Sequence, residues 1–520
     1  MPPVMLRSVL TVGAWTMASR VLGFVRDIVI AALLGAGPVA DAFVVALKLP
    51  NLFRRLFGEG AFNAAFIPAF AGTLAAEGTQ AARRIAEEAL AVMAVWLGAL
   101  TVLGVVAMPL IISVLAPGFS ADPAKFALTV ELTRITFPYL LLICLVALLS
   151  GVLQSLDRFA VAAGAPILFN LCAIFALWLL TPHVTTPGHA LAWGVVVSGM
   201  LQLVLVAAAC AAAGMPLAMP RPRLTPQVRA LLRRMGPGVV GGGVTQINLA
   251  VDTIIASFLP SGSVAFLYYA DRVNQLPLGV IGTAVGTALL PLLARQVRAG
   301  EEGASRHTLN RAIEITLVLT LPAALALAVC AGPIVAVLFG RGAFGEREIG
   351  ATAAALAVYA AALPAYVLTK PFSSGFFARG DTATPVRIGV VAVVLNIVLN
   401  LLLMGPFLHV GIALSTALAA LFNAAALGTM LWRRGHFVPD ARLAGRGLRM
   451  AVAACVMAAA LWAIEDRVFD AVEQMRGVRW VGLAVLVAGG MAAYFGTGLL
   501  IGAFRVGELT GLLRRRRRAA

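Results

Sequence analysis

The sequence predicts an all-α polytopic membrane protein with 14 transmembrane helices, arranged as two parallel six-helix lobes around a central cavity plus two extra C-terminal helices. Hydrophobic residues make up 61% of the chain and charged residues only 12%, which is far from the average of soluble domains. Apolar runs of roughly 20 residues, the length that crosses a bilayer as a helix, recur along the whole chain. In addition, part of the first half of the sequence is repeated in the second half.

The apolar runs are centred near residues 20, 50, 100, 140, 170, 200, 245, 280, 325, 362, 395, 420, 457 and 490. They lack the strict alternation of a transmembrane barrel, and a helix satisfies its own backbone hydrogen bonds in lipid. Each run is therefore expected to form a helix. Because Arg20 and Arg26 interrupt the first run, we expect a first transmembrane helix there and no cleavable signal peptide.

The basic residues predict the orientation. Of the 40 Lys and Arg residues, 26 lie at the N-terminus, in every second connection or in the tail, and six lie in the alternate connections. This asymmetry is the positive-inside pattern, and it predicts that both termini are cytoplasmic. The net charge of +17 is thus assigned mainly to topology and does not indicate nucleic-acid binding. The terminal run from Arg514 to Arg518 fits either a topogenic stop or a contact with anionic lipid.

An internal duplication relates the two halves. Residues 27–40 (DIVIAALLGAGPVA) match residues 252–265 (DTIIASFLPSGSVA) at seven of fourteen positions, with an offset of 225. Further identities recur at an offset of 224: Pro109/Pro333, Gly118/Gly342, Ser150/Ser374, Gly151/Gly375 and Asp157/Asp381. Such a series indicates a repeat, and because six helices separate equivalent points, both copies share one orientation in the membrane. The predicted parts are an N-terminal lobe (1–217), a C-terminal lobe (226–435), helices 13 and 14 (446–505) and a basic cytoplasmic tail (506–520).

Charged residues inside the apolar runs define the candidate site. A charge at the bilayer centre costs at least about 2.5 kcal/mol, so several charges in neighbouring spans imply a polar cavity. The first two spans hold five cations and three carboxylates, a net charge of +2, and Arg binds phosphate groups bidentately. The cavity is therefore expected to bind an anion such as a phosphate or diphosphate. The substrate-binding candidates are Arg20, Arg26, Asp41, Lys48, Arg54, Glu59 and Arg272, with Asp27, Arg55 and Asp271 in supporting positions.

Spacing in the second span supports a common face. Asp41, Lys48 and Arg55 are spaced by seven residues, which places them on one stripe of an ideal helix, and Pro50 is expected to kink that helix. Two alternatives stay open. The carboxylates can pair with cations and only hold helices together, and Arg55 and Arg134 can reach towards a membrane interface.

A weak metal site is a further candidate. Asp252, Asn396, Asn400 and Thr416 are isolated polar residues in apolar runs, and oxygen ligands of this kind can hold a small hard cation. The alternative use of such residues is hydrogen bonding between helices.

The sequence gives little support for an enzymatic function. None of the three lysines follows a glycine, so there is no Walker A loop. The histidines form no HExxH motif, and the five cysteines show no paired spacing. We therefore expect a transporter without a cofactor, driven by a gradient, by the membrane potential or by the substrate's own concentration difference.

Five segments carry a family resemblance: SRVLGFVRD (19–27), ADAFVVALKLPNLFRRLFGEGAFNAAFIP (40–68), APGF (116–119), TRITFPYLLL (133–142) and SGSVAFLYYADRVNQLPLGVIGTAVGTALLP (261–291). They resemble the MurJ family, also called MviN, of the multidrug/oligosaccharidyl-lipid/polysaccharide exporter superfamily. The resemblance implies a flippase that moves lipid II, the undecaprenyl-diphosphate-linked peptidoglycan precursor, across the bacterial inner membrane by alternating access. It also places the family's cavity arginines on Arg20, Arg26, Arg54 and Arg272, and its acidic and lysine positions on Asp41, Lys48 and Glu59.

The resemblance has further implications. Helices 13 and 14 are expected to form a groove for the prenyl tail. Asn400 stands where a carboxylate occurs in sodium-binding members, which predicts weak cation binding. Expected partners are lipid II, membrane lipids and cell-wall synthesis proteins, with no nucleic acid. Three rival functions stay open: an exporter of another lipid-linked oligosaccharide, a drug/cation antiporter, and a non-transporting membrane scaffold.

Overall fold

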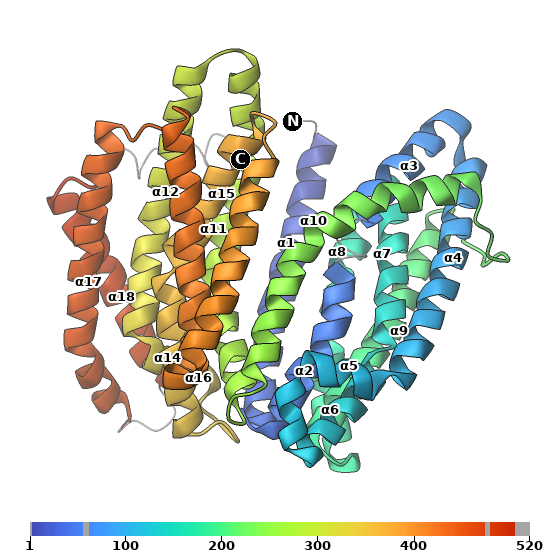
Figure 1. Cartoon of the computed structure of the whole chain (residues 1–520), viewed down its shortest axis with the longest axis horizontal. Coiled ribbons are helices and arrows are strands. Elements are labelled where there is room, and N and C mark those ends of the chain that lie inside the picture. Colours follow the sequence, from blue (N-terminus) through green and yellow to red (C-terminus); the bar gives the residue numbers. More distant parts are fainter. Residues whose placement is uncertain (1–2, 56–61, 474–478, 505–520) are drawn as a thin grey trace. The chain divides into compact units, whose positions relative to one another are not determined.

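The computed structural model describes residues 3–55, 62–473 and 479–504. In these ranges the chain forms helices joined by turns and contains no strand (Figure 1), which agrees with the predicted all-α class. The chain divides into two compact units. Unit 1 comprises Met1–Ala265 and Arg341–Phe344, and unit 2 comprises Phe266–Gly340 and Gly345–Ala520.

The described residues of unit 1 form α1 (Pro3–Leu34), α2 (Pro38–Phe53), α3 (Phe62–Glu77), α4 (Thr79–Val106), α5 (Met108–Leu115), η2 (Pro117–Ala121), α6 (Pro123–Thr136), α7 (Tyr139–Ser155), α8 (Phe159–Leu180), η3 (Thr181–His183), α9 (Pro187–Ala212) and α10 (Pro226–Ala256), where η marks a 3-10 helix. Helix α8 packs against α1 and α9, and α2 packs against α6. Proline begins several of these helices, where its missing N–H has no helical partner to lose. Asp122 caps α6 by accepting the backbone N–H groups of Ala124 and Lys125 at 3.1 Å.

Unit 2 contains most of α11 (Ser263–Arg298), together with α12 (Glu302–Val329), α13 (Ala331–Phe339), α14 (Glu346–Ala361), α15 (Leu363–Phe377), α16 (Ala383–Arg433), α17 (Ala441–Glu473) and α18 (Arg479–Leu500). Helix α12 packs against α15 and α17, and α17 packs against α18. Two buried clusters lie between these helices, one around Leu309 and Phe372 and one around Met457 and Tyr494.

Helix α16 is two helices joined by a sharp break. Leu408 has φ 51° and ψ −133°, and Pro406 precedes it. A Cβ atom on Gly411 would lie 2.2 Å from the carbonyl oxygen of Leu403, so only glycine allows the two halves to meet this closely. The predicted spans near residues 395 and 420 therefore occupy the two sides of this break.

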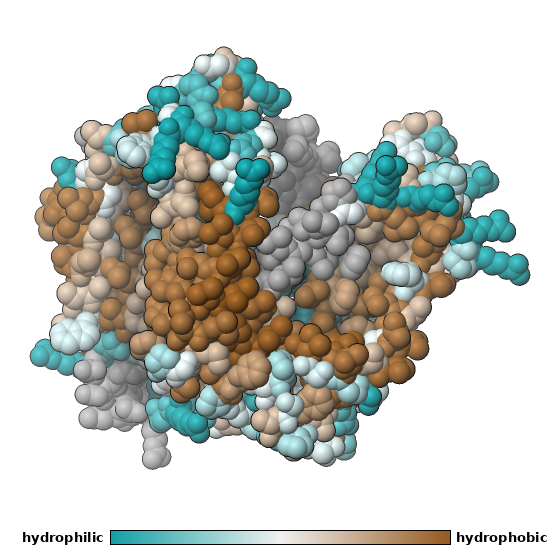
Figure 2. Space-filling model, viewed as in Figure 1, coloured by the Kyte–Doolittle hydropathy of each residue, from teal (hydrophilic) through white to brown (hydrophobic). Residues whose placement is uncertain are grey.

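The helices suit a membrane. Among the described residues, nine helical segments are long and apolar enough to cross a bilayer. Figure 2 shows apolar residues gathered over the middle of the helices on the visible face, with hydrophilic residues nearer the helix ends. Apart from residue 362, which lies at the break between α14 and α15, each predicted span centre falls inside a helix. The layout agrees with the predicted multi-pass architecture.

The duplication is visible in the order of elements. The short helix α5 is followed by η2 and by α6 and α7, which are separated at Phe137 and Pro138. In the second half α13 is followed by a turn and by α14 and α15, which are separated at Ala362. The unit boundary does not follow the proposed lobe boundary, because α10 lies in unit 1. The lobe division at 217 and 226 stays a prediction.

Candidate functional site

The best-defined part of the predicted site is the charged pair on α1. The Nε and Nη2 atoms of Arg26 donate to Oδ1 of Asp27 at 3.1 and 2.7 Å. Both residues are buried, and the Arg26 guanidinium carbon lies 5.2 Å from the centre of the Phe169 ring, a cation–π distance. Arg20, about two turns earlier, is exposed. The structure thus pairs Arg26 with Asp27, both of which are candidates from the sequence, whereas their role in substrate binding stays a prediction.

Asn170 on α8 completes this cluster and was missed by the sequence analysis. Its Oδ1 atom accepts a hydrogen bond from Nη1 of Arg26 at 3.0 Å, and its Nδ2 atom donates to the carbonyl of Ser19 at 3.0 Å. The signal that could have found it is the one applied to Asn396 and Asn400, a polar residue isolated in an apolar run.

Asp41 lies in the first turn of α2 and is 1% exposed. Its Oδ2 atom accepts hydrogen bonds from Nζ of Lys125 at 2.6 Å and from the backbone N–H of Gly262 at 2.7 Å. Its Oδ1 atom accepts the backbone N–H of Ala265 at 2.8 Å. Asp41 therefore joins α2, α6 and the beginning of α11, where a negative charge also complements the helix dipole.

Lys125 is the second residue that sequence analysis did not place in the site, because it was counted only as a cation in a connection. Its side chain is 5% exposed. The Nζ atom contacts Asp41, donates to Oγ of Ser261 at 3.2 Å and lies 4.0 Å from the centre of the Phe119 ring. Lys125 is 84 residues from Asp41, so no local pattern connects the two.

The remaining charges of the second predicted span lie near the end of α2. Lys48 and Arg54 are half-buried and Arg55 is exposed, whereas Glu59 lies outside the described residues. Pro50 stays inside α2. Because proline has no N–H, it cannot bond to the carbonyl of Ala46, and the Thr136 hydroxyl donates to that carbonyl at 3.2 Å.

Two of the candidates from the sequence lie in unit 2. Asp271 and Arg272 on α11 are both half-buried. The Arg272 guanidinium carbon lies 4.8 Å from the centre of the Tyr268 ring, and the Gln275 amide donates to Asp271.

Three of the four cation-site candidates lie together on α16. Nδ2 of Asn400 donates to Oδ1 of Asn396 at 3.1 Å, and Nδ2 of Asn396 donates to Oγ1 of Thr416 at 3.3 Å. Asp252 is on α10 in unit 1. No group of three or more His, Cys, Asp or Glu side chains able to hold a metal ion occurs in the described part of the chain. The weak cation site stays a prediction.

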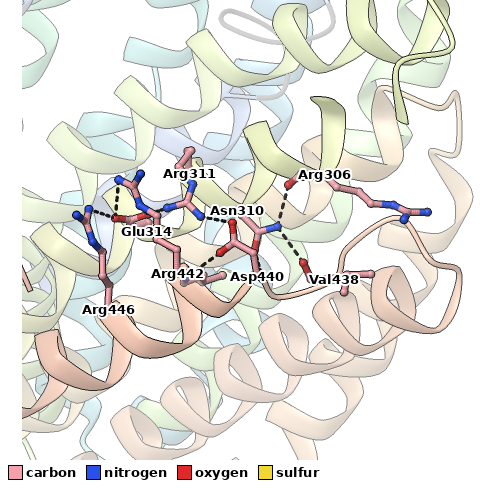
Figure 3. Close-up of polar contacts among 9 residues, drawn as sticks. Arg306, Asn310, Arg311, Glu314, Val438, Asp440, Arg442 and Arg446 are labelled. Carbon is pink, nitrogen blue, oxygen red and sulfur yellow. Dashed lines mark hydrogen bonds and ion pairs between the residues drawn. The ribbon is translucent and has the colours of Figure 1, made fainter. Parts of the chain in front are cut away.

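A separate charged cluster connects α12 to α17 (Figure 3). Glu314 is paired with Arg311, with Arg446 at 2.8 Å and with Arg442 at 3.4 Å, and Arg311 also pairs with Asp440. The sequence analysis had counted these arginines only as topogenic charges. Here they hold α17 against α12.

Asp440 also begins α17, because its Oδ1 atom accepts the backbone N–H of Leu443 at 2.7 Å. Burial by itself would raise the pKa of Asp440, but the hydrogen bonds from Leu443 and Arg311 outweigh this and keep the pKa below its ordinary value. Asp440 is therefore ionised at neutral pH and suits its arginine partner.

Comparison with known proteins identifies relatives of this chain. A sequence model of the family described as "Lipid II flippase MurJ" matches residues 30–474. A "Probable lipid II flippase MurJ" from Rhizobium meliloti is 44% identical over 95% of this chain and 93% of that protein. A "Lipid II flippase MurJ" from Burkholderia cenocepacia is 35% identical over 84% of this chain and 85% of that protein.

Solved structures agree at the level of the fold. A structure described as "Lipid II flippase MurJ, inward closed conformation" matches with a TM-score of 0.78 and 22% identity, over 94% of this chain and 98% of that chain. An inward-facing multidrug transporter of the MATE family, in the MOP superfamily, matches with a TM-score of 0.68 and 15% identity, over 82% of this chain and 97% of that chain.

Proposed function

Because this chain belongs to the MurJ family of lipid II flippases, we propose that it moves lipid II between the leaflets of the bacterial inner membrane by alternating access. The transported lipid carries a diphosphate, so its headgroup is anionic. The observation that carries the proposal within the site is Arg26, a buried guanidinium in a membrane helix. A buried cation is costly without an anionic partner, and Arg26 pairs with the adjacent Asp27 at 2.7 Å, so a guanidinium suited to an anion lies inside the membrane helix.

The proposed ligands of the diphosphate and headgroup are the arginines predicted from the sequence, Arg20, Arg26, Arg54 and Arg272. Lys48 and Glu59 are proposed to line the same cavity. Asp41 can contact the headgroup only after its contacts with Lys125 and the start of α11 have opened. We therefore propose that Asp41 holds α2 to α6 and to the beginning of α11, all within unit 1.

The orientation follows from the distribution of basic residues. With both termini in the cytoplasm, the far end of α1 and the start of α2 lie on the periplasmic side. The Asp41–Lys125 pair would then lie near the periplasmic side of unit 1. Closing one side and opening the other requires different affinities for the two states.

Transport of this kind makes and breaks no covalent bond in the substrate, and we propose no enzymatic step for this chain. Cell-wall synthesis proteins are proposed as partners, since they consume the flipped precursor. The groove for the prenyl tail is proposed at helices α17 and α18.

Depletion and complementation test the function. Depleting the protein in its host should make lipid II accumulate on the cytoplasmic face, because delivery to the periplasm stops. Alanine at Arg20, Arg26, Arg54 or Arg272 should each abolish complementation while membrane insertion stays normal. The matched control is Arg134→Ala, because the Arg134 side chain is exposed and its Nε atom donates to the backbone carbonyl of Val105. Normal growth of any three of the four site variants would contradict the proposed anion site.

A further inference from the structure

The amide of Asn170 is fixed in one orientation between α8 and α1. Its nitrogen faces two carbonyl oxygens, those of Ser19 at 3.0 Å and Pro166 at 3.5 Å, and its oxygen faces Arg26. The opposite assignment would point N–H groups at a guanidinium, which has only donors.

We propose that Asn170 is a positioning residue for substrate binding, which holds the Arg26 guanidinium in place without neutralising it. This inference rests on the proposed function, because it assigns Arg26 to the diphosphate of the transported lipid. Asn170 itself is not proposed to touch the substrate.

The contacts of Arg26 divide between its two edges. The edge formed by Nε and Nη2 donates to Asp27, and Nη1 donates to Asn170. A guanidinium is planar, so contacts at two edges and the Phe169 ring at 5.2 Å fix both its position and its plane. Asn170 contributes the contact at Nη1 from a different helix, α8, whereas Asp27 is a neighbour on α1 itself. A ligand that must meet a fixed guanidinium binds more tightly than one that must order it.

The neutrality of Asn170 matters as much as its hydrogen bond. Arg26 and Asp27 together carry no net charge. A second carboxylate at position 170 would add a negative charge beside Arg26, and this charge would oppose the binding of a diphosphate. A carboxamide gives the same acceptor atom without the charge. The residue type at this position is thus suited to an arginine that has to bind an anion, because an arginine with only a structural role would be held at least as well by a carboxylate.

Three substitutions separate positioning from stabilisation. Asn170→Leu removes both hydrogen bonds at similar volume, and Asn170→Asp keeps an acceptor but adds a charge. Asn310→Leu is the matched control, because Asn310 is a buried asparagine on α12 that donates to the Val438 carbonyl at 2.9 Å outside the site. Lipid II dissociation constants are measured on folded, monodisperse protein in detergent, and thermal unfolding is measured in parallel.

We expect Asn170→Leu to weaken lipid II binding about tenfold, the scale of one hydrogen bond to a charged group. Asn170→Asp should weaken binding by more than about tenfold, because it adds repulsion of the diphosphate. Asn310→Leu should lower the unfolding temperature and leave the dissociation constant unchanged. In an Arg26→Ala background, Asn170→Leu should cause no further loss of binding, because it acts through Arg26.

Wild-type affinity in Asn170→Asp, or an equal loss of affinity from Asn170→Leu with and without Arg26, would overturn the inference. These outcomes differ from a failure of the proposed function. In that case Arg26→Ala itself would bind lipid II as tightly as the unchanged protein.

Discussion

The two copies of the duplicated segment make the same backbone contact. In the first copy Gly118 of η2 lies against Ser257 at the end of α10, and in the second copy Gly342 lies against Ala32 near the end of α1. A Cβ atom on Gly118 would be 2.3 Å from the Ser257 carbonyl oxygen, and one on Gly342 would be 2.2 Å from that of Ala32. The two glycines are 224 residues apart, and their partners are 225 residues apart.

The side chains next to these contacts differ. The first contact is accompanied by the buried Asp41–Lys125 pair, and Phe119 beside Gly118 packs on Lys125. At the same offsets, the second copy has Phe266 for Asp41 and Ile349 for Lys125, and both are buried. A backbone contact at this distance admits only glycine, whereas a side-chain contact can be built from charges or from apolar groups. The duplication has therefore kept the glycines and changed the chemistry around them.

The largest effect is expected from breaking the ion pair that distinguishes the first copy. Asp41→Ala should destabilise the protein by about 3–5 kcal/mol, because it leaves the Lys125 ammonium buried without its counter-charge. It also removes the acceptor for the N–H groups at the start of α11. Denaturant unfolding in detergent measures the change.

Adding Lys125→Met to Asp41→Ala should recover part of that loss, because no unpaired charge then stays buried. Arg83→Ala is the control, since it breaks a more exposed pair with Glu87 and should cost no more than about 1 kcal/mol. If Asp41→Ala cost as little as this control, the pair would not stabilise the first contact.

A smaller effect is expected from filling the glycine contacts. Gly118→Ala should cost about 1–3 kcal/mol, because the added methyl group overlaps a backbone carbonyl that cannot rotate away. Gly342→Ala should cost about 1–2 kcal/mol more, because Gly342 also has a φ of +60°. The unfolding midpoints of both variants are compared with that of Gly332→Ala, since nothing lies within 4 Å of a Cβ on Gly332. Equal midpoints for all three variants would show that neither contact is tight in the protein.

The smallest effect concerns Asp381, the counterpart of Asp157 at the offset of 224. Hydrogen bonds from the Thr384 side chain and backbone, and then from Arg434, hold the pKa of Asp381 well below its ordinary value. A depressed carboxyl pKa contributes stability that is present above the ordinary pKa of about 4 and is lost as the pH falls towards the folded-state value.

The unfolding temperature of the protein should therefore decrease as the pH is lowered below about 4. The Asp381→Asn variant should show a smaller decrease over the same pH range. Asp157→Asn is the matched control in the first copy. If the unfolding temperature depended on acid pH in the same way with and without Asp381, this carboxylate would not contribute to stability.

The sequence allowed much of the architecture to be predicted, because the hydrophobic length of a span and the placement of basic residues are local properties. The all-α class, a helix around every predicted span centre except residue 362, and the family agree with the structure and the comparisons. Arg26 and Asp27 were both candidates from the sequence, but their pairing with each other was not predicted. The predicted stripe of charges on α2 was less informative, because the Asp41 carboxylate accepts hydrogen bonds from Lys125 and from backbone N–H groups.

The contacts between site residues and partners on other helices could not be predicted in this way. Asn170 is 144 residues from Arg26, and Lys125 is 84 residues from Asp41. Periodicity identifies the face of a helix on which a residue lies, but it does not identify the helix that packs there. Composition, topology and the excess of cations in the early spans were thus determined by the sequence alone. Tertiary packing alone decided that a neutral amide holds Arg26, that Asp41 and Lys125 form a buried pair, and that Gly118 and Gly342 lie against a backbone carbonyl. The reason is that each of these buried groups depends on a partner that is distant in the chain.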